Sequence, residues 1–305
     1  MEAHPLSRFW PLIYSLLQEL WSITEPRIEA TALRARTPVE LYHYAELGLD
    51  EFSIRGFQKR DPYSNRERFE KLFARLVING WIAPMPDGSY LVTAGARQAA
   101  YDMIQAGDHS LADLTPELDL DLQRLATLLQ TLVEASRVAP EPPEQWAVLK
   151  RFRVANAESP VLAQIREALM DLFAYRDDSH YAASRPHFGE AGIVWSVLGA
   201  LWNGEAMTAE QMVEKMAVRG YDVADYEVAL QAAVELGWAE TGSRFEIYHL
   251  TEAGRALREQ AEHLTNEYFF RPWSALQVTE LKELYQLLVA LRDQLRERSR
   301  TQQHS

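Results

Sequence analysis

A run of basic residues between positions 55 and 75 is the part of this sequence with the clearest capacity for chemistry. It holds seven Lys and Arg residues against three acids, Asp61, Glu67 and Glu70. Guanidinium and ammonium groups bind phosphate oxygens, and polar side chains at a helix start can contact phosphates or base edges. The candidate residues are Arg55, Lys59, Arg60, Ser64, Asn65, Arg66, Arg68, Lys71 and Arg75. The run predicts a polyanion-binding face; the alternative is a solvated or protein-binding helix face, because Arg and Glu alternate here.

The element that must position these cations is an amphipathic helix. Phe69, Leu72, Phe73 and Leu76 recur at helical spacing, so Arg68, Lys71 and Arg75 fall together on another face. A Gly-Trp pair at 80–81 follows, then a hairpin around an Asp-Gly turn at 87–88, and then Thr93 as the expected N-cap of a further helix.

The same arrangement is written a second time, 157 residues later. Gly237-Trp238 aligns with Gly80-Trp81, and matched residues flank it on both sides. The aligned pairs are Phe69 and Tyr226, Phe73 and Leu230, Val77 and Val234, Tyr90 and Tyr248, Thr93 and Thr251, and Arg97 and Arg255. The register extends to an opening helix and to a leucine-striped closing helix in each half. Several matches across five successive elements predict an internal duplication rather than chance.

The duplication defines the expected domain organisation. The first unit, an opening helix, a winged helix and a closing helix, is predicted at 1–137, and its copy at 151–295. A Pro/Glu-rich linker is expected at 138–150 and a disordered polar tail at 296–305. The expected fold is mainly α with small β-hairpin wings (α+β), in which tandem units flanked by long helices are related by a pseudo-two-fold axis.

The second copy resembles the winged helix-turn-helix of MarR-type regulators. Residues 207–257 run from a capped helix through a turn at Gly220 to a second helix and a hairpin that closes with Leu250-Thr251-Glu252-Ala253-Gly254-Arg255. This ending is similar to the Leu-Thr-x-x-Gly-Arg of that family, whereas the first copy keeps only Thr93-Ala94-Gly95. The resemblance implies DNA binding by the second helix of each motif, and two fused copies would form a monomeric pseudo-dimer or, alternatively, a homodimer.

The two copies differ in charge where the resemblance places DNA. The second helix of the later copy has Asp222, Asp225, Glu227 and Glu235 and no Lys or Arg. Phosphates would repel such a surface, so we expect DNA contacts mainly from the first copy.

A second group of polar and aromatic residues is a weaker candidate for ligand binding. The candidates are His180, Arg185, His187, Tyr268 and Trp273. Arg185 beside the two imidazoles could hold an anionic ligand. The resemblance to MarR-type regulators implies an aromatic-walled crevice for a small apolar or phenolic effector, and Tyr268 and Trp273 are the candidates for its wall. The commoner roles for such residues are interdomain hydrogen bonding for the first three and core packing for the aromatic pair.

Composition limits the other function classes. The net charge of −13 argues against nucleic-acid binding over the whole surface, and the absence of cysteine excludes thiolate metal sites and disulfides. Neither a signal peptide nor a transmembrane stretch is recognisable, so we expect a cytoplasmic protein without a membrane partner. No catalytic, metal or cofactor motif occurs, and no enzyme activity is predicted.

These observations favour a DNA-binding transcriptional regulator with double-stranded DNA as its partner and a possible small-molecule effector. The rival hypothesis is a winged-helix-derived ligand- or protein-binding module that no longer binds DNA. A DNA-processing enzyme that uses His180 and His187 for chemistry is a third and weaker alternative.

Overall fold

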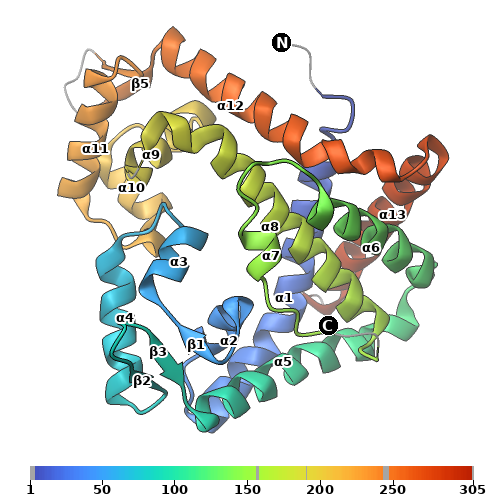
Figure 1. Ribbon diagram of the computed structural model, residues 1–305. Helices are drawn as coiled ribbons and strands as arrows, with labels where there is room; N and C mark the ends of the chain where they lie inside the picture. The colour runs from blue at the N-terminus through green and yellow to red at the C-terminus, as the bar shows by residue number, and fades with distance from the viewer. Residues whose placement is uncertain (1–3, 156–157, 190, 243–246, 304–305) are drawn as a thin grey trace. The chain divides into compact units, whose positions relative to one another are not determined.

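The computed structural model describes residues 4–155, 158–189, 191–242 and 247–303. It confirms a mainly helical fold with two small antiparallel sheets (Figure 1). The chain divides into two compact units, and each draws on both halves of the sequence. Unit 1 comprises residues 1–50, 92–179 and 266–305, and unit 2 comprises residues 51–91 and 180–265.

The two halves of the sequence pass through a similar order of elements. The first half has α1 (Phe9–Ala35), α2 (Glu40–Tyr44), η1 (Ala45–Leu47), β1 (Glu51–Phe52), α3 (Ile54–Arg60), α4 (Arg66–Ile78), β2 (Ile82–Pro84), β3 (Tyr90–Val92), α5 (Ala94–Leu114), η2 (Thr115–Glu117) and α6 (Leu122–Val138). After α7 (Ala147–Lys150), the second half has α8 (Val161–Phe188), α9 (Gly192–Asn203), α10 (Ala209–Lys215), η3 (Ala217–Arg219), α11 (Val223–Glu235), β4 (Ala239–Thr241), β5 (Tyr248–Leu250), α12 (Glu252–Phe270), η4 (Arg271–Ala275) and α13 (Val278–Gln303). The 13-residue helices α4 and α11 occupy matching places.

Unit 1 is a helical assembly around one apolar core. Leucines at helical spacing on α1, α6 and α13 are buried together with the first half of α8, as the leucine stripes predict. Trp273 is fully buried in this core against Phe9, Phe269 and Phe270. The burial of these faces, rather than helix propensity, holds the helices in place.

The predicted Pro/Glu-rich linker and the predicted disordered tail both pack into unit 1. The predicted linker contains α7, whose Ala147 and Val148 are buried and donate their backbone N–H groups to the Asp178 carboxylate at 2.8 and 3.0 Å. The predicted disordered tail from residue 296 is helical to Gln303, because α13 continues and Arg296 bonds Glu19 at 2.7 Å. Side-chain partners distant in sequence, Asp178 for the linker and Glu19 for the tail, hold both segments.

In unit 2, both Gly-Trp pairs of the sequence lie at the end of a helix. Gly80 and Gly237 have φ values of +72° and +74°, a conformation that glycine adopts without strain. The N–H of Trp81 then donates to the Leu76 carbonyl at 2.9 Å, and the N–H of Trp238 donates to the Ala233 carbonyl at 2.9 Å. This is the hydrogen-bond pattern of a Schellman helix end, so α4 and α11 terminate in the same way.

Each terminating helix leads into a short hairpin. In the first half, β2 and β3 pair around the Asp87-Gly88 turn, and β1 adds a third strand in the order β1-β3-β2. In the second half β4 pairs with β5 from Ala239 opposite Leu250 to Thr241 opposite Tyr248. The turn of this second hairpin, 243–246, lies outside the described residues.

Candidate nucleic-acid interface

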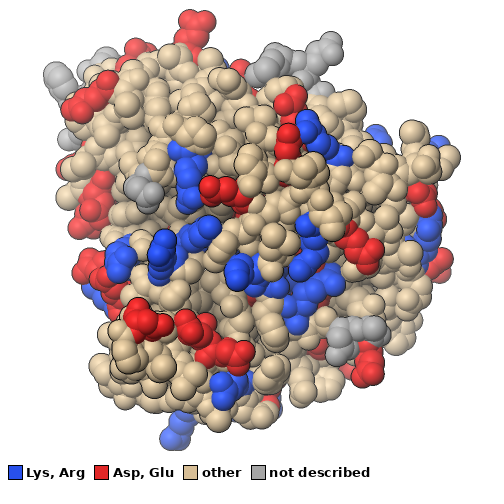
Figure 2. Space-filling model, in the orientation of Figure 1, with Lys and Arg blue, Asp and Glu red and all other residues tan. Residues whose placement is uncertain are grey.

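Helix α4 has the features that its sequence predicts. Phe69, Leu72, Phe73 and Leu76 are buried, and the side chain of the N-cap Asn65 accepts a hydrogen bond from the Glu67 N–H at 2.9 Å. Burial of this apolar stripe leaves the opposite face of α4 in solvent. Basic side chains gather over α3 and the adjoining end of α4 in Figure 2.

The most accessible cations of this surface are Arg55 on α3 and Arg66, Lys71 and Arg75 on α4. Arg66 pairs with Glu70 at 2.6 Å and Lys71 pairs with Glu67 at 2.9 Å, both at i, i+4 spacing. Exposed pairs of this kind contribute about 0–1 kcal/mol, so a phosphate can replace the glutamate at little cost. Lys59 and Arg60 are half-buried in the last turn of α3.

The residues at the start of α4 are engaged within the protein. The Asn65 N–H donates to the Arg219 carbonyl at 2.8 Å, and the Asn65 Nδ2 donates to the Gly220 carbonyl at 3.3 Å. Ser64 is 4% exposed, and its hydroxyl donates to Asp61 at 2.5 Å. The turn of the second helix-turn-helix therefore covers the end of α4 that would read base edges.

Close packing joins the segment of α3 and α4 to the helix-turn-helix segment of the second half within unit 2. A Cβ atom on Gly192 would lie 2.1 Å from the Pro62 carbonyl oxygen, and one on Gly220 would lie 2.9 Å from the Cβ of Arg68. The Arg219 guanidinium stacks over the Tyr63 ring at 5.1 Å. Only glycine at 192 permits this approach, so the contact between the segments is built into the sequence.

The second helix-turn-helix presents a different surface. Asp222 and Asp225 form a reciprocal capping box at the start of α11, and Glu227 and Glu235 are exposed along the helix. Acidic side chains lie along the edge that α11 occupies in Figure 2. The inward face of α11 matches that of α4, while its outward face has the opposite charge.

The packing of α12 against the second hairpin depends on one glycine. The Thr251 hydroxyl accepts from the Gly254 N–H at 3.0 Å and donates to the Gly237 carbonyl at 2.7 Å. A Cβ atom on Gly254 would lie 2.1 Å from the Trp238 carbonyl oxygen. The glycine of the Leu-Thr-x-x-Gly-Arg ending thus lets the helix N-terminus touch the Gly-Trp backbone.

The sequence-predicted ligand residues fall in different units. In unit 2, His187 stacks on Trp195 with ring centroids 5.9 Å apart, and His180 contacts Tyr63 and Trp195. Arg185 in the same unit is half-buried. In unit 1, the Tyr268 carbonyl accepts from the Tyr175 hydroxyl at 3.2 Å, and Trp273 lies in the core. The two histidines and Trp273 make ring contacts, and Tyr268 contributes a backbone hydrogen-bond acceptor.

Within the described ranges, no group of three or more His, Asp or Glu residues is arranged to hold a metal ion. None of the described helices is long and apolar enough to cross a membrane.

Sequence reasoning missed the residues that join the two helix-turn-helix segments. The sequence pattern predicts a turn at Gly220 but gives no expectation for Gly192. The signal that was available is that glycine is unusual at the start of a strongly apolar helix and indicates a close backbone neighbour.

Residues 151–302 match the model of a helix-turn-helix family. The match supports a helix-turn-helix DNA-binding domain in this part of the chain, which contains α8 to α13. No curated protein and no solved structure matches the sequence significantly.

Proposed function

We propose that the protein is a DNA-binding transcriptional regulator built from two diverged, MarR-like winged-helix copies, with DNA contacts mainly from the first copy. The observation that supports this most is the exposed basic face of α3 and α4, on the element that a helix-turn-helix places against DNA. The family match to the second half and the shared order of elements support the two-copy interpretation.

The geometry favours contacts to phosphates over contacts to bases. Arg55, Arg66, Lys71 and Arg75 are accessible, whereas Ser64 and Asn65 at the start of α4 are engaged by other groups. Phosphate contacts are insensitive to sequence and strongly dependent on salt. We therefore expect this form of the protein to bind duplex DNA with a steep salt dependence and modest sequence preference.

The test is fluorescence anisotropy with a labelled duplex across a salt series. The variant Arg66→Gln/Lys71→Gln/Arg75→Gln removes three exposed cations and adds no acidic residue to α4. Each lost phosphate contact lowers the slope of log K against log salt by about 0.9, so we expect a decrease of up to about 2.7 and at least a tenfold loss of affinity at low salt.

A matched control removes the same charge from unit 1. Arg34, Lys150 and Lys282 are exposed cations there, and Arg34→Gln/Lys150→Gln/Lys282→Gln changes the net charge equally. We expect this variant to bind almost as the wild type does. Equal losses in both variants would contradict the proposed face, and absence of wild-type binding at low salt would favour a module that no longer binds DNA.

A further inference from the structure

The turn that joins η3 to α11 packs on the start of α4. The Asn65 N–H donates to the Arg219 carbonyl at 2.8 Å, and the Asn65 Nδ2 donates to the Gly220 carbonyl at 3.3 Å. The stem of Arg68 lies on the same turn, because a Cβ atom on Gly220 would be 2.9, 3.2 and 3.3 Å from its Cβ, Cδ and Cγ atoms. The turn therefore occupies the space in front of Asn65 and Arg68.

The two covered side chains are of the types that distinguish base pairs. An asparagine amide can bond two edge atoms of an adenine, and an arginine guanidinium can bond two acceptors of a guanine. Asn65 is the N-cap of α4 and Arg68 lies in its first turn, where a helix-turn-helix contacts base edges. Here the Asn65 side chain bonds the Gly220 carbonyl and the Glu67 N–H, so a two-bond contact with a base is blocked.

The covering turn also leads directly into negative charge. Asp222 and Asp225 follow Gly220 and form the capping box at the start of α11. The phosphates of a duplex that approached Asn65 would meet these carboxylates and be repelled. The turn thus keeps DNA from the start of α4 both by the space it fills and by the charge beside it.

The covering turn has little buried surface of its own. None of the three residues of η3 is buried, and Val218 in its middle is 73% exposed. Its contacts with the first segment include the two hydrogen bonds from Asn65 and the stack of the Arg219 guanidinium on the Tyr63 ring at 5.1 Å. Segments with few buried apolar contacts open locally at a much lower free energy than the core does.

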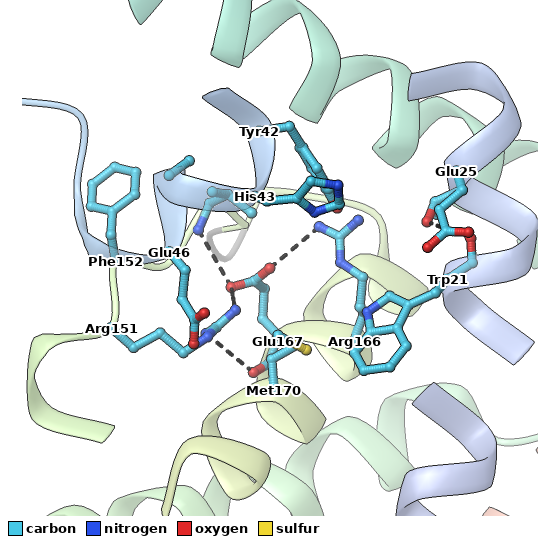
Figure 3. Close-up of a pocket in the computed structure, with 13 residues that line it drawn as sticks. Trp21, Glu25, Tyr42, His43, Glu46, Arg151, Phe152, Arg166, Glu167 and Met170 are labelled. Atoms are coloured by element: carbon cyan, nitrogen blue, oxygen red, sulfur yellow. Dashed lines mark hydrogen bonds and ion pairs between the residues drawn. The ribbon is translucent and has the colours of Figure 1, made fainter. Parts of the chain in front are cut away.

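A buried ion network in unit 1 shows, by contrast, how a permanent contact in this chain is built. Arg151 bonds Glu167 at 2.9 Å and Asp171 at 2.8 Å, and Arg166 bonds Asp108 at 2.9 Å. Figure 3 shows the Glu167 carboxylate between the guanidinium groups of Arg151 and Arg166. Breaking such a network leaves buried charges without partners, which is strongly unfavourable. Groups at the η3 turn would instead be solvated by water.

We propose that the Arg219-Gly220 turn is an autoinhibitory cover, which a duplex of the preferred sequence displaces so that Asn65 and Arg68 reach base edges. The inference rests on the proposed function and adds its regulation. The exposed cations of α3 and α4 stay accessible with the cover in place, so any duplex binds through its phosphates. A ligand shifts a conformational equilibrium only by its difference in affinity for the two forms. A matching duplex gains base contacts in the open form alone and therefore favours it.

The first test needs no DNA. Gly220→Asn places a side chain against Arg68, and asparagine tolerates the φ of +74° at this position. Gly204→Asn is the matched control, because Gly204 has a φ of +69° and open space around it. We expect hydrogen exchange of the Asn65 amide, followed by NMR, to be about tenfold or more faster in Gly220→Asn than in the wild type and unchanged in Gly204→Asn.

Unchanged exchange in Gly220→Asn, or equal acceleration in both variants, overturns the cover. If Gly220→Asn does not fold, Arg219→Ala replaces it, because it removes the stack on Tyr63 and leaves both glycines in place. The same acceleration of Asn65 exchange is then expected, and its absence overturns the cover.

The second test connects the cover to sequence reading. Wild type and variants select from a library of randomised duplexes at matched fractional binding, and sequencing measures the enrichment of the strongest motif. We expect about fivefold or greater enrichment by Gly220→Asn relative to the wild type, because the cover no longer competes with base contacts. Gly220→Asn/Arg68→Gln should lose this gain.

The outcomes separate the cover from the proposed function. If the wild type binds DNA but Gly220→Asn enriches no motif beyond the wild-type level, the proposed function stands and the autoinhibitory cover is wrong. If none of the proteins binds duplex DNA at low salt, the proposed function fails and the autoinhibitory role fails with it, even where exchange at Asn65 is accelerated.

Discussion

The helices α4 and α11 have similar buried faces and different exposed faces. Both bury an aromatic-led stripe, and both end in the same Gly-Trp hydrogen-bond pattern. Residues 51–91 contain seven Lys and Arg against five acids, whereas residues 180–265 contain six against thirteen, so only the first segment is net positive. The requirements of folding account for what the two helices share, and their opposite surface charges are the basis of our proposal that DNA contacts come mainly from α4.

The largest expected effect on this comparison comes from the contact between Gly192 and Pro62. Gly192→Ala would place a methyl group 2.1 Å from the Pro62 carbonyl oxygen, so we expect a loss of about 2–3 kcal/mol in the free energy of unfolding. Chemical denaturation measures it. Gly199→Ala in the same helix has open space around it and should instead stabilise by about 0.5–1 kcal/mol.

Similar stabilities for the two alanine variants would mean that the segments do not pack as described. If Gly192→Ala also binds duplex DNA more tightly than the wild type, the turn at Arg219 and Gly220 obstructs the reading end of α4. Unchanged affinity would show that phosphate contacts alone determine binding.

The hairpin endings provide a second and smaller test. Gly254 touches the Trp238 carbonyl, whereas Gly95, which aligns with Ala253, has open space. We expect Gly254→Ala to lower the free energy of unfolding by about 1–2 kcal/mol and Gly95→Ala to raise it by about 0.4–1 kcal/mol. Thermal and chemical denaturation together measure the difference. The same sign for both variants would argue that the two endings pack alike.

Much of the fold could be predicted from such local features. The Gly-Trp helix ends, the hairpins and the leucine stripes are set by residues close together in sequence. The covering of Asn65 by Arg219 and Gly220 could not be predicted, because it joins residues about 155 positions apart by backbone contacts that leave no periodic pattern.

The same reasoning explains what was missed in unit 1. Arg166, Glu167 and Asp171 interrupt an otherwise apolar helix, and a charge in a helix is usually solvated. Their burial depends on Arg151 and Asp108, which come from other parts of the chain. The helix stripe predicted the core correctly but could not reveal which charges are buried in it.

The smallest expected effect comes from adding a cation to each helix. Val228 on α11 is exposed and aligns with Lys71, and Ala74 is exposed one turn further along α4. We expect Ala74→Lys to increase the salt slope of DNA binding by up to about 0.9 and Val228→Lys to change the affinity by less than about twofold. Anisotropy titrations detect both. A larger gain from Val228→Lys would place α11 against DNA.

The most direct measurement is photo-crosslinking from equivalent positions of the two helices. p-Benzoyl-phenylalanine is introduced in place of Lys71 in one protein and Val228 in another, and each is irradiated with labelled duplex at low salt. Our account predicts a DNA adduct from position 71 and little or none from position 228. Equal yields, an adduct from position 228 alone, or no adduct from either would contradict the claim that the first copy is the DNA-contacting half.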